Sequence, residues 1–330
     1  MRSLRADCCS SMTLERPESA SDLHYRAFAL PLRSSFPLPG LAPAPEEPDA
    51  LSVQLASDAD LECLWSGADG EPVWVTAIDG RRYTMAPGRE GDYLMTYGRD
   101  ARFLLSSDLR ELRCSPARPT QAGWRRFLLD TVLWSASLLN GIELMHASAV
   151  RSEAGVTAFA AFSGGGKTSL AFELMRRGAS FFADDILAFP PSGDELHAHP
   201  APALMNLPRH NTGHDRVGDV LGRFPAEDWV AVPGAAREPD RVTTVCLLRR
   251  RPAARLALRR LRPTVLDLLP FALAFPHLRA RRRQRFMVFA RLATEAPVYE
   301  LSAPPDAPPG SLADLVEPLV LGPDRQERAA

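Results

Sequence analysis

The sequence predicts an α/β protein in which a nucleotide-binding core follows a smaller β-rich domain. The first observation behind this is a series of short apolar runs, separated by Pro-rich and Gly-rich breaks, in the first third of the chain. The second is a strand, a glycine-rich loop, a helix and a further strand in quick succession over residues 146–187, an order typical of α/β cores. The third is the length of 330 residues, which suits about two domains.

These patterns divide the chain into four parts. We expect a flexible tail over residues 1–23, which are charged and lack the apolar stretch of a signal peptide. A β-rich N-terminal domain is expected over 24–118, and the core domain over 119–321, with 119–143 as a helical lead-in. A second tail follows over 322–330.

Periodicity and turn chemistry predict the elements of each part. In the β-rich domain the apolar runs, for example 24–30 and 93–97, predict a small antiparallel sheet. Apolar residues at helical spacing predict a long helix over 121–142. Strands are expected over 146–150, 156–162 and 242–249, and a short one over 298–301. Helices are expected near 218–224 and over 263–275, 279–293 and 311–321, the last with Ser311 as its N-cap.

Charge and composition exclude several classes of protein. The net charge of −1 argues against a nucleic-acid partner, which normally leaves a strongly basic chain. The longest apolar stretch, residues 127–145, is interrupted by Asp130, Asn140 and Glu143, so we expect no membrane association. Five scattered cysteines show no spacing typical of zinc ligands or a disulfide framework, and a cytoplasmic protein with reduced thiols is expected.

The segment from Ala161 to Thr168, AFSGGGKT, resembles the phosphate-binding pattern G-x-x-x-x-G-K-[ST], with Ala161 in place of the first glycine. Lys167 is the only lysine beside 38 arginines, and it stands where phosphate chemistry needs a compact ammonium. The alternative is a glycine-rich turn without a ligand, and Ala161 could narrow the entrance of the loop. The residues expected to bind the nucleotide phosphates are Ser163, Gly164, Gly165, Gly166, Lys167, Thr168 and Ser169.

Two further elements flank this loop in the sequence. An apolar run ends in Asp184 and Asp185, 17 and 18 residues after Lys167. Carboxylates at the end of a core strand can hold Mg²⁺ or accept a proton, although paired aspartates are also common in ordinary turns. His146 opens the strand before the loop, where it is either a structural histidine or an electrostatic partner of the phosphates.

Together, His146-Ala-Ser-Ala-Val, Ser163-Gly-Gly-Gly-Lys-Thr and Ala183-Asp-Asp resemble the kinase domain of the HPr kinase/phosphorylase family. The resemblance implies a P-loop kinase core related to phosphoenolpyruvate carboxykinase and ATP- and Mg²⁺-dependent phosphoryl transfer to a serine. It also implies that Lys167 binds the phosphates, that Asp184 is the catalytic base, that Thr168 and Asp185 serve the metal, and that His146 lines the catalytic site. The family often assembles into rings, so a homo-oligomer is conceivable.

The chain departs from that family after the aspartate pair. The glycine-rich stretch with an acidic metal ligand is missing, and residues 201–209 read APALMNLPR. The sequence is more similar to divergent HPr-kinase-like proteins, including lasso-peptide kinases. We therefore expect a phosphotransferase whose acceptor is a serine of a peptide or protein, for example a ribosomally made precursor. The alternatives are a small-metabolite kinase, a non-catalytic nucleotide-binding module of a peptide-maturation complex and, more weakly, a peptide-binding scaffold.

Two arginine-rich stretches, 249–262 and 279–285, can be solvated basic faces, docking sites for an acidic peptide, neutralisers of phosphate, or surfaces that bind nucleic acid or a membrane. Solvated faces are the prediction favoured by the arginine-rich composition. His197 and His199 form an H-x-H pair that we place in a loop, because no further ligand pattern accompanies it.

Overall fold

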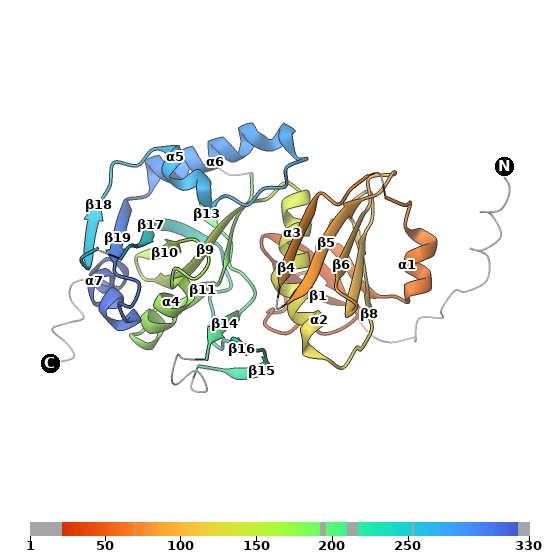
Figure 1. Cartoon of the computed structure of the whole chain (residues 1–330), viewed down its shortest axis with the longest axis horizontal. Helices are drawn as coiled ribbons and strands as arrows, with labels where there is room; N and C mark the ends of the chain where they lie inside the picture. The colour runs from red at the N-terminus through yellow and green to blue at the C-terminus, as the bar shows by residue number, and fades with distance from the viewer. Residues whose placement is uncertain are drawn as a thin grey trace. The chain divides into compact units, whose positions relative to one another are not determined.

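The computed structural model describes residues 22–68, 70–78, 80–191, 196–209, 217–252 and 254–322, and shows a mixed α/β protein with several sheets (Figure 1). Contacts between Cα atoms divide the chain into two compact units. Unit 1 contains the described residues up to Arg26 together with 31–38 and 43–132. Unit 2 contains 27–30, 39–42 and the chain from Leu133 onward. The helical lead-in expected over 119–143 is therefore shared between the units, which divide after Val132.

Unit 1 is built on an eight-stranded sheet. Its strands, in spatial order, are β1 (Leu23–Ala27), β2 (Leu30–Ser34), β3 (Leu51–Leu55), β8 (Glu111–Pro116), β7 (Ala101–Leu105), β6 (Tyr93–Tyr97), β5 (Arg81–Pro87) and β4 (Trp74–Ile78). The short helix α1 (Asp58–Leu64) begins with a capping box between Ser57 and Asp60. Helix α2 (Ala122–Phe127) carries Phe127, whose ring stacks on Tyr97 at 4.3 Å.

Unit 2 is built on a second sheet, and its core strands lie in the order β11-β9-β10-β17-β19-β18. Their bounds are β11 (Ser180–Ala183), β9 (Glu143–Ser152), β10 (Gly155–Ala160), β17 (Asp240–Arg250), β19 (Val298–Ala303) and β18 (Ala257–Arg260). Strands β10, β17 and β19 run parallel, and β9 is antiparallel to β10. Strands β12 (Ile186–Phe189) and β13 (His197–Ala198) pair with β9 and β17.

Helices cover both faces of this sheet (Figure 1). On one face, α4 (Lys167–Arg176) and α7 (Pro309–Leu321) enclose an apolar cluster with side chains of β9, β10 and β17. On the other face, α5 (Val265–Leu268), the 3-10 turn η3 (Leu269–Phe271) and α6 (Arg282–Glu295) enclose a second cluster. Because side chains alternate along a strand, β9, β10, β11, β17 and β19 each contribute residues to both clusters, which explains their long apolar runs.

One arginine joins α4 to α7 at the end of α4. Arg177 donates to the carboxylates of Glu173 (3.2 Å), Asp314 (2.8 Å) and Glu317 (2.7 Å), and also to the carbonyl oxygen of Gly310 (3.1 Å). The two helices are thereby held side by side through one planar guanidinium.

A small third sheet, β14-β16-β15, completes the unit (β14 Leu204–Pro208, β16 Glu227–Ala231, β15 Asp219–Arg223). The helix expected near 218–224 was wrong, because this segment forms β15. A Cβ atom on Gly218 would lie 1.6 Å from the carbonyl oxygen of Ala231, so the glycine permits a close backbone approach there.

Other expectations need correction. The sheet of unit 1 is not wholly antiparallel, since β3 runs parallel to both β2 and β8. The strand expected over 24–30 is divided by a turn at Phe28 and Ala29, which have φ of 49° and 65°. The helix expected over 121–142 contains a π-helical segment, η1 (Leu128–Val132), before α3 (Leu133–Leu139). The helix expected over 263–275 is only α5 followed by η3, and α7 begins at Pro309, not at Ser311.

Among the described residues, no helix combines the length and the apolar character that a membrane span requires.

Candidate active site

The glycine-rich loop connects β10 to α4, and its backbone needs each of its three glycines. Gly164 and Gly166 have φ of 76° and 91°, which disfavour any side chain. A Cβ atom on Gly165 would lie 2.5 Å from the Cβ of Ala161. Ala161 is 1% exposed and packs in the apolar cluster under α4, so its methyl group lies in the core and does not narrow the loop entrance. The loop thus presents backbone N–H groups at the start of α4, an arrangement that favours an anion.

Lys167 is the first residue of α4 and is 5% exposed. Its ammonium nitrogen lies 2.8 Å from Nε2 of His146 and 3.8 Å from Oδ1 of Asp185. Strands β9 and β10 are antiparallel, so β9 begins at the end of the sheet where β10 leads into the loop. His146, near the start of β9, therefore lies close to Lys167. Burial lowers the pKa of His146, and the positive charge of Lys167 lowers it further, whereas Asp185 opposes the shift. The imidazole is therefore neutral at pH 7 and accepts a hydrogen bond from the ammonium group.

Asp184 lies at the centre of a buried hydrogen-bond network. Its Oδ1 accepts from the hydroxyls of Ser148 (2.7 Å) and Thr168 (2.8 Å), and its Oδ2 accepts from the backbone N–H of Asn206 (3.1 Å). Burial raises its pKa to about 7, with a contribution from the charge of Asp185, although the three hydrogen bonds act in the opposite direction. A carboxyl group with this pKa can exchange a proton near neutral pH.

Asp185 occupies the turn between β11 and β12 with a left-handed backbone, φ 61°. Both strands pair with β9, and the carbonyl oxygen of Asp185 accepts from the N–H of Ala147 at 3.0 Å. Aspartate tolerates this conformation better than most residues do. The turn leaves the Asp185 side chain 46% exposed beside Lys167, whereas that of Asp184 is buried.

Two residues of this site were not singled out from the sequence. Ser148 lies two positions after His146 on β9, and therefore on the same face of the sheet. Arg250, at the end of β17, donates from Nε to the carbonyl oxygen of Gly165 at 3.3 Å and from one terminal nitrogen to those of Pro304 (2.9 Å) and Ala307 (3.1 Å). The sequence holds no signal that distinguishes Arg250 within its arginine-rich run, because only the parallel pairing of β10 and β17 places the end of β17 beside the loop.

The donor set fits a magnesium ion that arrives with a nucleotide. Thr168, Asp184 and Asp185 offer a hydroxyl and two carboxylates within one short stretch of structure. In the described ranges, no group of three or more His, Cys, Asp or Glu side chains gathers around a common point. Mg²⁺ commonly binds through one or two carboxylates together with phosphate oxygens and water, so such a group is not required.

The other candidate features are structural or lie elsewhere. In the stretch 279–285, Arg281 and Arg285 bind the buried carboxylate of Glu143 at 3.1 and 3.2 Å. His197 lies on β13, and the N–H of His199 donates to Ala188, so this pair belongs to strand pairing and not to a loop.

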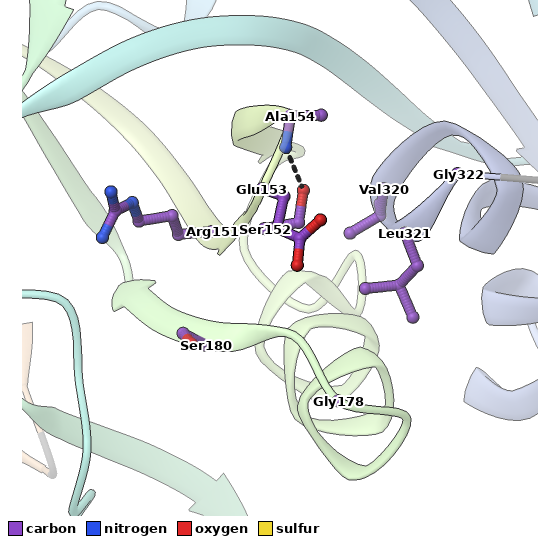
Figure 2. A pocket seen from close by; sticks show the side chains of 9 residues that line it. All are labelled: Arg151, Ser152, Glu153, Ala154, Gly178, Ser180, Val320, Leu321 and Gly322. Atoms are coloured by element: carbon purple, nitrogen blue, oxygen red, sulfur yellow. Dashed lines mark hydrogen bonds between the residues drawn. The ribbon is translucent and has the colours of Figure 1, made fainter. Parts of the chain in front are cut away.

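A cavity of about 650 Å³ opens where β9 turns into β10, and it is lined by residues that include Arg151, Glu153, Gly178 and Leu321 (Figure 2). Ser152, which lines this cavity, lies six positions after His146 on the extended strand β9, a distance of roughly 20 Å. The cavity is therefore not part of the Lys167 site.

No protein-family model matches the chain, and no curated protein matches it. Among solved structures, it is similar to the HPr(Ser) kinase/phosphatase from Coxiella burnetii, with 16% identical residues and a TM-score of 0.31. The alignment covers 56% of this chain and 90% of that one.

Proposed function

We propose that this protein is an ATP-dependent kinase that transfers the γ-phosphoryl group to a serine hydroxyl of a peptide or protein. One observation carries the proposal: the only lysine, at the end of a three-glycine loop, lies within 4 Å of both His146 and Asp185. In the same place Thr168, the next residue of α4, donates to Asp184. An ordinary glycine-rich turn does not require a buried lysine, a histidine and two carboxylates beside it.

The loop and Lys167 bind the phosphates in this proposal. Apart from that of Gly165, which donates to the carbonyl oxygen of Phe162, the N–H groups of residues 163–169 surround the phosphate chain in this proposal. The helix dipole of α4 favours the negative charge of the phosphates. His146 holds the side chain of Lys167 in place, and the ammonium group binds the β- and γ-phosphates. Arg250 holds the carbonyl oxygen of Gly165 turned away from the anion.

Asp184 is the proton acceptor. As the serine oxygen forms its bond to phosphorus, the bond from phosphorus to the β,γ-bridging oxygen of ATP breaks, and the hydroxyl proton passes to the Asp184 carboxylate. A pKa of about 7 suits this role, because about half of the Asp184 side chains carry the carboxylate at pH 7, and that carboxylate is basic enough to take a proton. Mg²⁺, when bound, neutralises charge on the transferring phosphoryl group; Thr168 and Asp185 are the residues proposed to hold it.

The test is phosphoryl transfer from γ-labelled ATP with Mg²⁺ to a panel of serine-containing peptides and, separately, to hydroxylated metabolites. We expect label on serine, lost in the Lys167→Ala and Asp184→Asn variants. Label only on metabolites would favour a small-molecule kinase. ATP binding without transfer to any acceptor would favour a non-catalytic nucleotide-binding module and would contradict the proposal.

A further inference from the structure

A buried serine lies beside the proposed proton acceptor. Ser148 is fully buried on β9, between Ala147 and Ala149, which are buried as well. Its hydroxyl donates to Oδ1 of Asp184 at 2.7 Å, although 36 positions separate the two residues along the chain. A buried hydroxyl costs free energy unless it has a partner, so a third alanine would suit the core of this strand better. The reason for the serine therefore lies at Asp184 and not within β9.

The two carboxylate oxygens of Asp184 are held unequally. Oδ1 accepts hydrogen bonds from two hydroxyls, that of Ser148 and that of Thr168 at 2.8 Å. Among the described residues, Oδ2 accepts only from the backbone N–H of Asn206, at 3.1 Å. Each carboxylate oxygen offers two lone pairs to donors. Oδ1 is therefore saturated, whereas Oδ2 keeps one lone pair for a further donor.

The three donors to Asp184 come from three different elements, β9, α4 and β14, and together they fix the plane of the carboxylate. Their other duties differ. The N–H of Asn206 belongs to the backbone, and the hydroxyl of Thr168 is the one proposed to offer a lone pair to Mg²⁺. The hydroxyl of Ser148 makes no other hydrogen bond in the described part of the chain, so it acts on Asp184 alone.

Loss of the Ser148 hydroxyl would change the direction in which Asp184 presents its lone pairs. Oδ1 would keep one donor, that of Thr168, and would gain an open lone pair. The carboxylate would then be free to turn about its Cβ–Cγ bond, and the open lone pair of Oδ2 would no longer have one direction. A general base is efficient only when it is aimed at the proton that it takes, so such freedom slows proton transfer.

Resting on the proposed serine kinase activity, we propose that Ser148 is a positioning residue, which holds Oδ1 of Asp184 and thereby directs Oδ2 at the accepting hydroxyl. As the acceptor oxygen forms its bond to phosphorus, its O–H bond breaks and the proton passes to the open lone pair of Oδ2. Ser148 and Thr168 keep their own protons throughout. The accepting hydroxyl therefore approaches Asp184 at the oxygen that also contacts Asn206 of β14.

The experiment measures initial rates of the full chain with γ-labelled ATP, Mg²⁺ and the serine-containing peptide of the panel that the wild type labels fastest. Ser148→Ala should lower kcat roughly 10- to 100-fold and leave the KM for ATP and for the peptide unchanged, because only the transition state needs an aimed carboxylate.

Two further substitutions separate the hydroxyl from the packing. Threonine and valine have nearly the same shape and differ in the hydroxyl, so Ser148→Thr should retain most of the activity and Ser148→Val should lose it. Ser137→Ala is the matched control, because it removes the hydroxyl of another fully buried serine, on α3, and should leave kcat unchanged. Thermal unfolding of each variant shows whether the fold is retained.

The outcomes separate this inference from the proposed function. A lower Tm of Ser148→Ala with an unchanged kcat means a purely structural role, which overturns the inference and leaves the kinase activity standing. Equal rates of Ser148→Thr and Ser148→Val overturn it as well. If the wild type labels no peptide, the proposed function is overturned, and the release of inorganic phosphate from ATP to water then decides the inference: Ser148→Ala must slow it. A wild type without either reaction overturns both.

Discussion

The ammonium nitrogen of Lys167 and Nε2 of His146 lie 2.8 Å apart, although 21 residues separate them along the chain. The contact exists because β9 and β10 form a hairpin and α4 begins where that hairpin ends. Lys167 is almost fully buried there, between the loop and a neutral imidazole. The space is shaped for a slender side chain that ends in a compact charge.

Lys167→Arg should therefore reduce phosphoryl transfer at least roughly 10²-fold, because a planar guanidinium cannot replace the ammonium group between His146 and Asp185. Initial rates with γ-labelled ATP measure the effect, and thermal unfolding shows whether the fold is retained. Near-normal activity of this variant would mean that the identity of the cation is unimportant.

The pH dependence should follow Asp184. Transfer needs its carboxylate, so the rate should fall about tenfold for each pH unit below 7.

The contribution of Asp184 to the stability of the fold should change with pH in the opposite direction and be largest at low pH. The pKa of Asp184 in the folded state is raised above the ordinary value of 3.8. The stability that this carboxyl group contributes is therefore fully present below about pH 4 and is lost as the pH rises to about 7. The Tm of the Asp184→Asn variant should thus exceed that of the wild type by more at pH 8 than at pH 4. An equal difference in Tm at both pH values would contradict the raised pKa of Asp184.

Asp185→Asn should raise the Mg²⁺ concentration needed for half-maximal transfer about tenfold, because it removes one charged ligand. Asparagine also accepts the left-handed backbone at this position, so the fold should be unaffected. Mg²⁺ titrations of this variant and of Asp184→Asn compare the two carboxylates. If Asp184→Asn alters the Mg²⁺ requirement and Asp185→Asn does not, then Asp184 is the metal ligand, which would contradict the proposed roles of the two carboxylates.

Arg250→Gln should weaken MgATP binding about tenfold, since the loop loses the donor that orients the carbonyl oxygen of Gly165. Fluorescent ATP analogues provide the measurement. Arg251→Gln is the control, because the Arg251 side chain is 61% exposed and lies 3.8 Å from the carboxylate of Glu300. Equal effects of the two substitutions would indicate that general positive charge, and not this hydrogen bond, matters.

Glu143→Gln should lower the free energy of unfolding by about 3 kcal/mol, because Arg281 and Arg285 would keep their charges with no buried counter-ion. Urea denaturation measures this change. Glu295→Gln breaks only the partly exposed pair with Arg291 and should change stability by less than about 1 kcal/mol. A loss as small as that of the control would show that the Glu143 cluster contributes no net stability.

The sequence was informative where the structure is local. Three glycines, one lysine and the aspartate pair are recognisable because a loop between a strand and a helix needs little more than its own residues. It was less informative where distant strands pair. The parallel arrangement of β2, β3 and β8 depends on which strands become neighbours, and no short pattern encodes that choice.

The same reason explains the residues that sequence reasoning missed. Arg250 belongs to an arginine-rich run whose members look alike in the sequence, and only the register of β17 with β10 distinguishes it from Arg251. The segment 219–223 has the composition of a short helix, but Gly218 and the pairing with β16 make it a strand.

The junction between α4 and α7 has an evolutionary consequence. Arg177 donates hydrogen bonds to three carboxylates from two helices. A natural substitution at position 177 would therefore leave these negative charges close together without a positive charge between them. Positions 173, 314 and 317 should therefore be inherited together with 177, and lineages that lose the arginine should also have lost at least two of the acids. Covariation among these four positions would show that selection acts on the helix behind the phosphate loop as a unit with the last helix, 140 residues further along the chain.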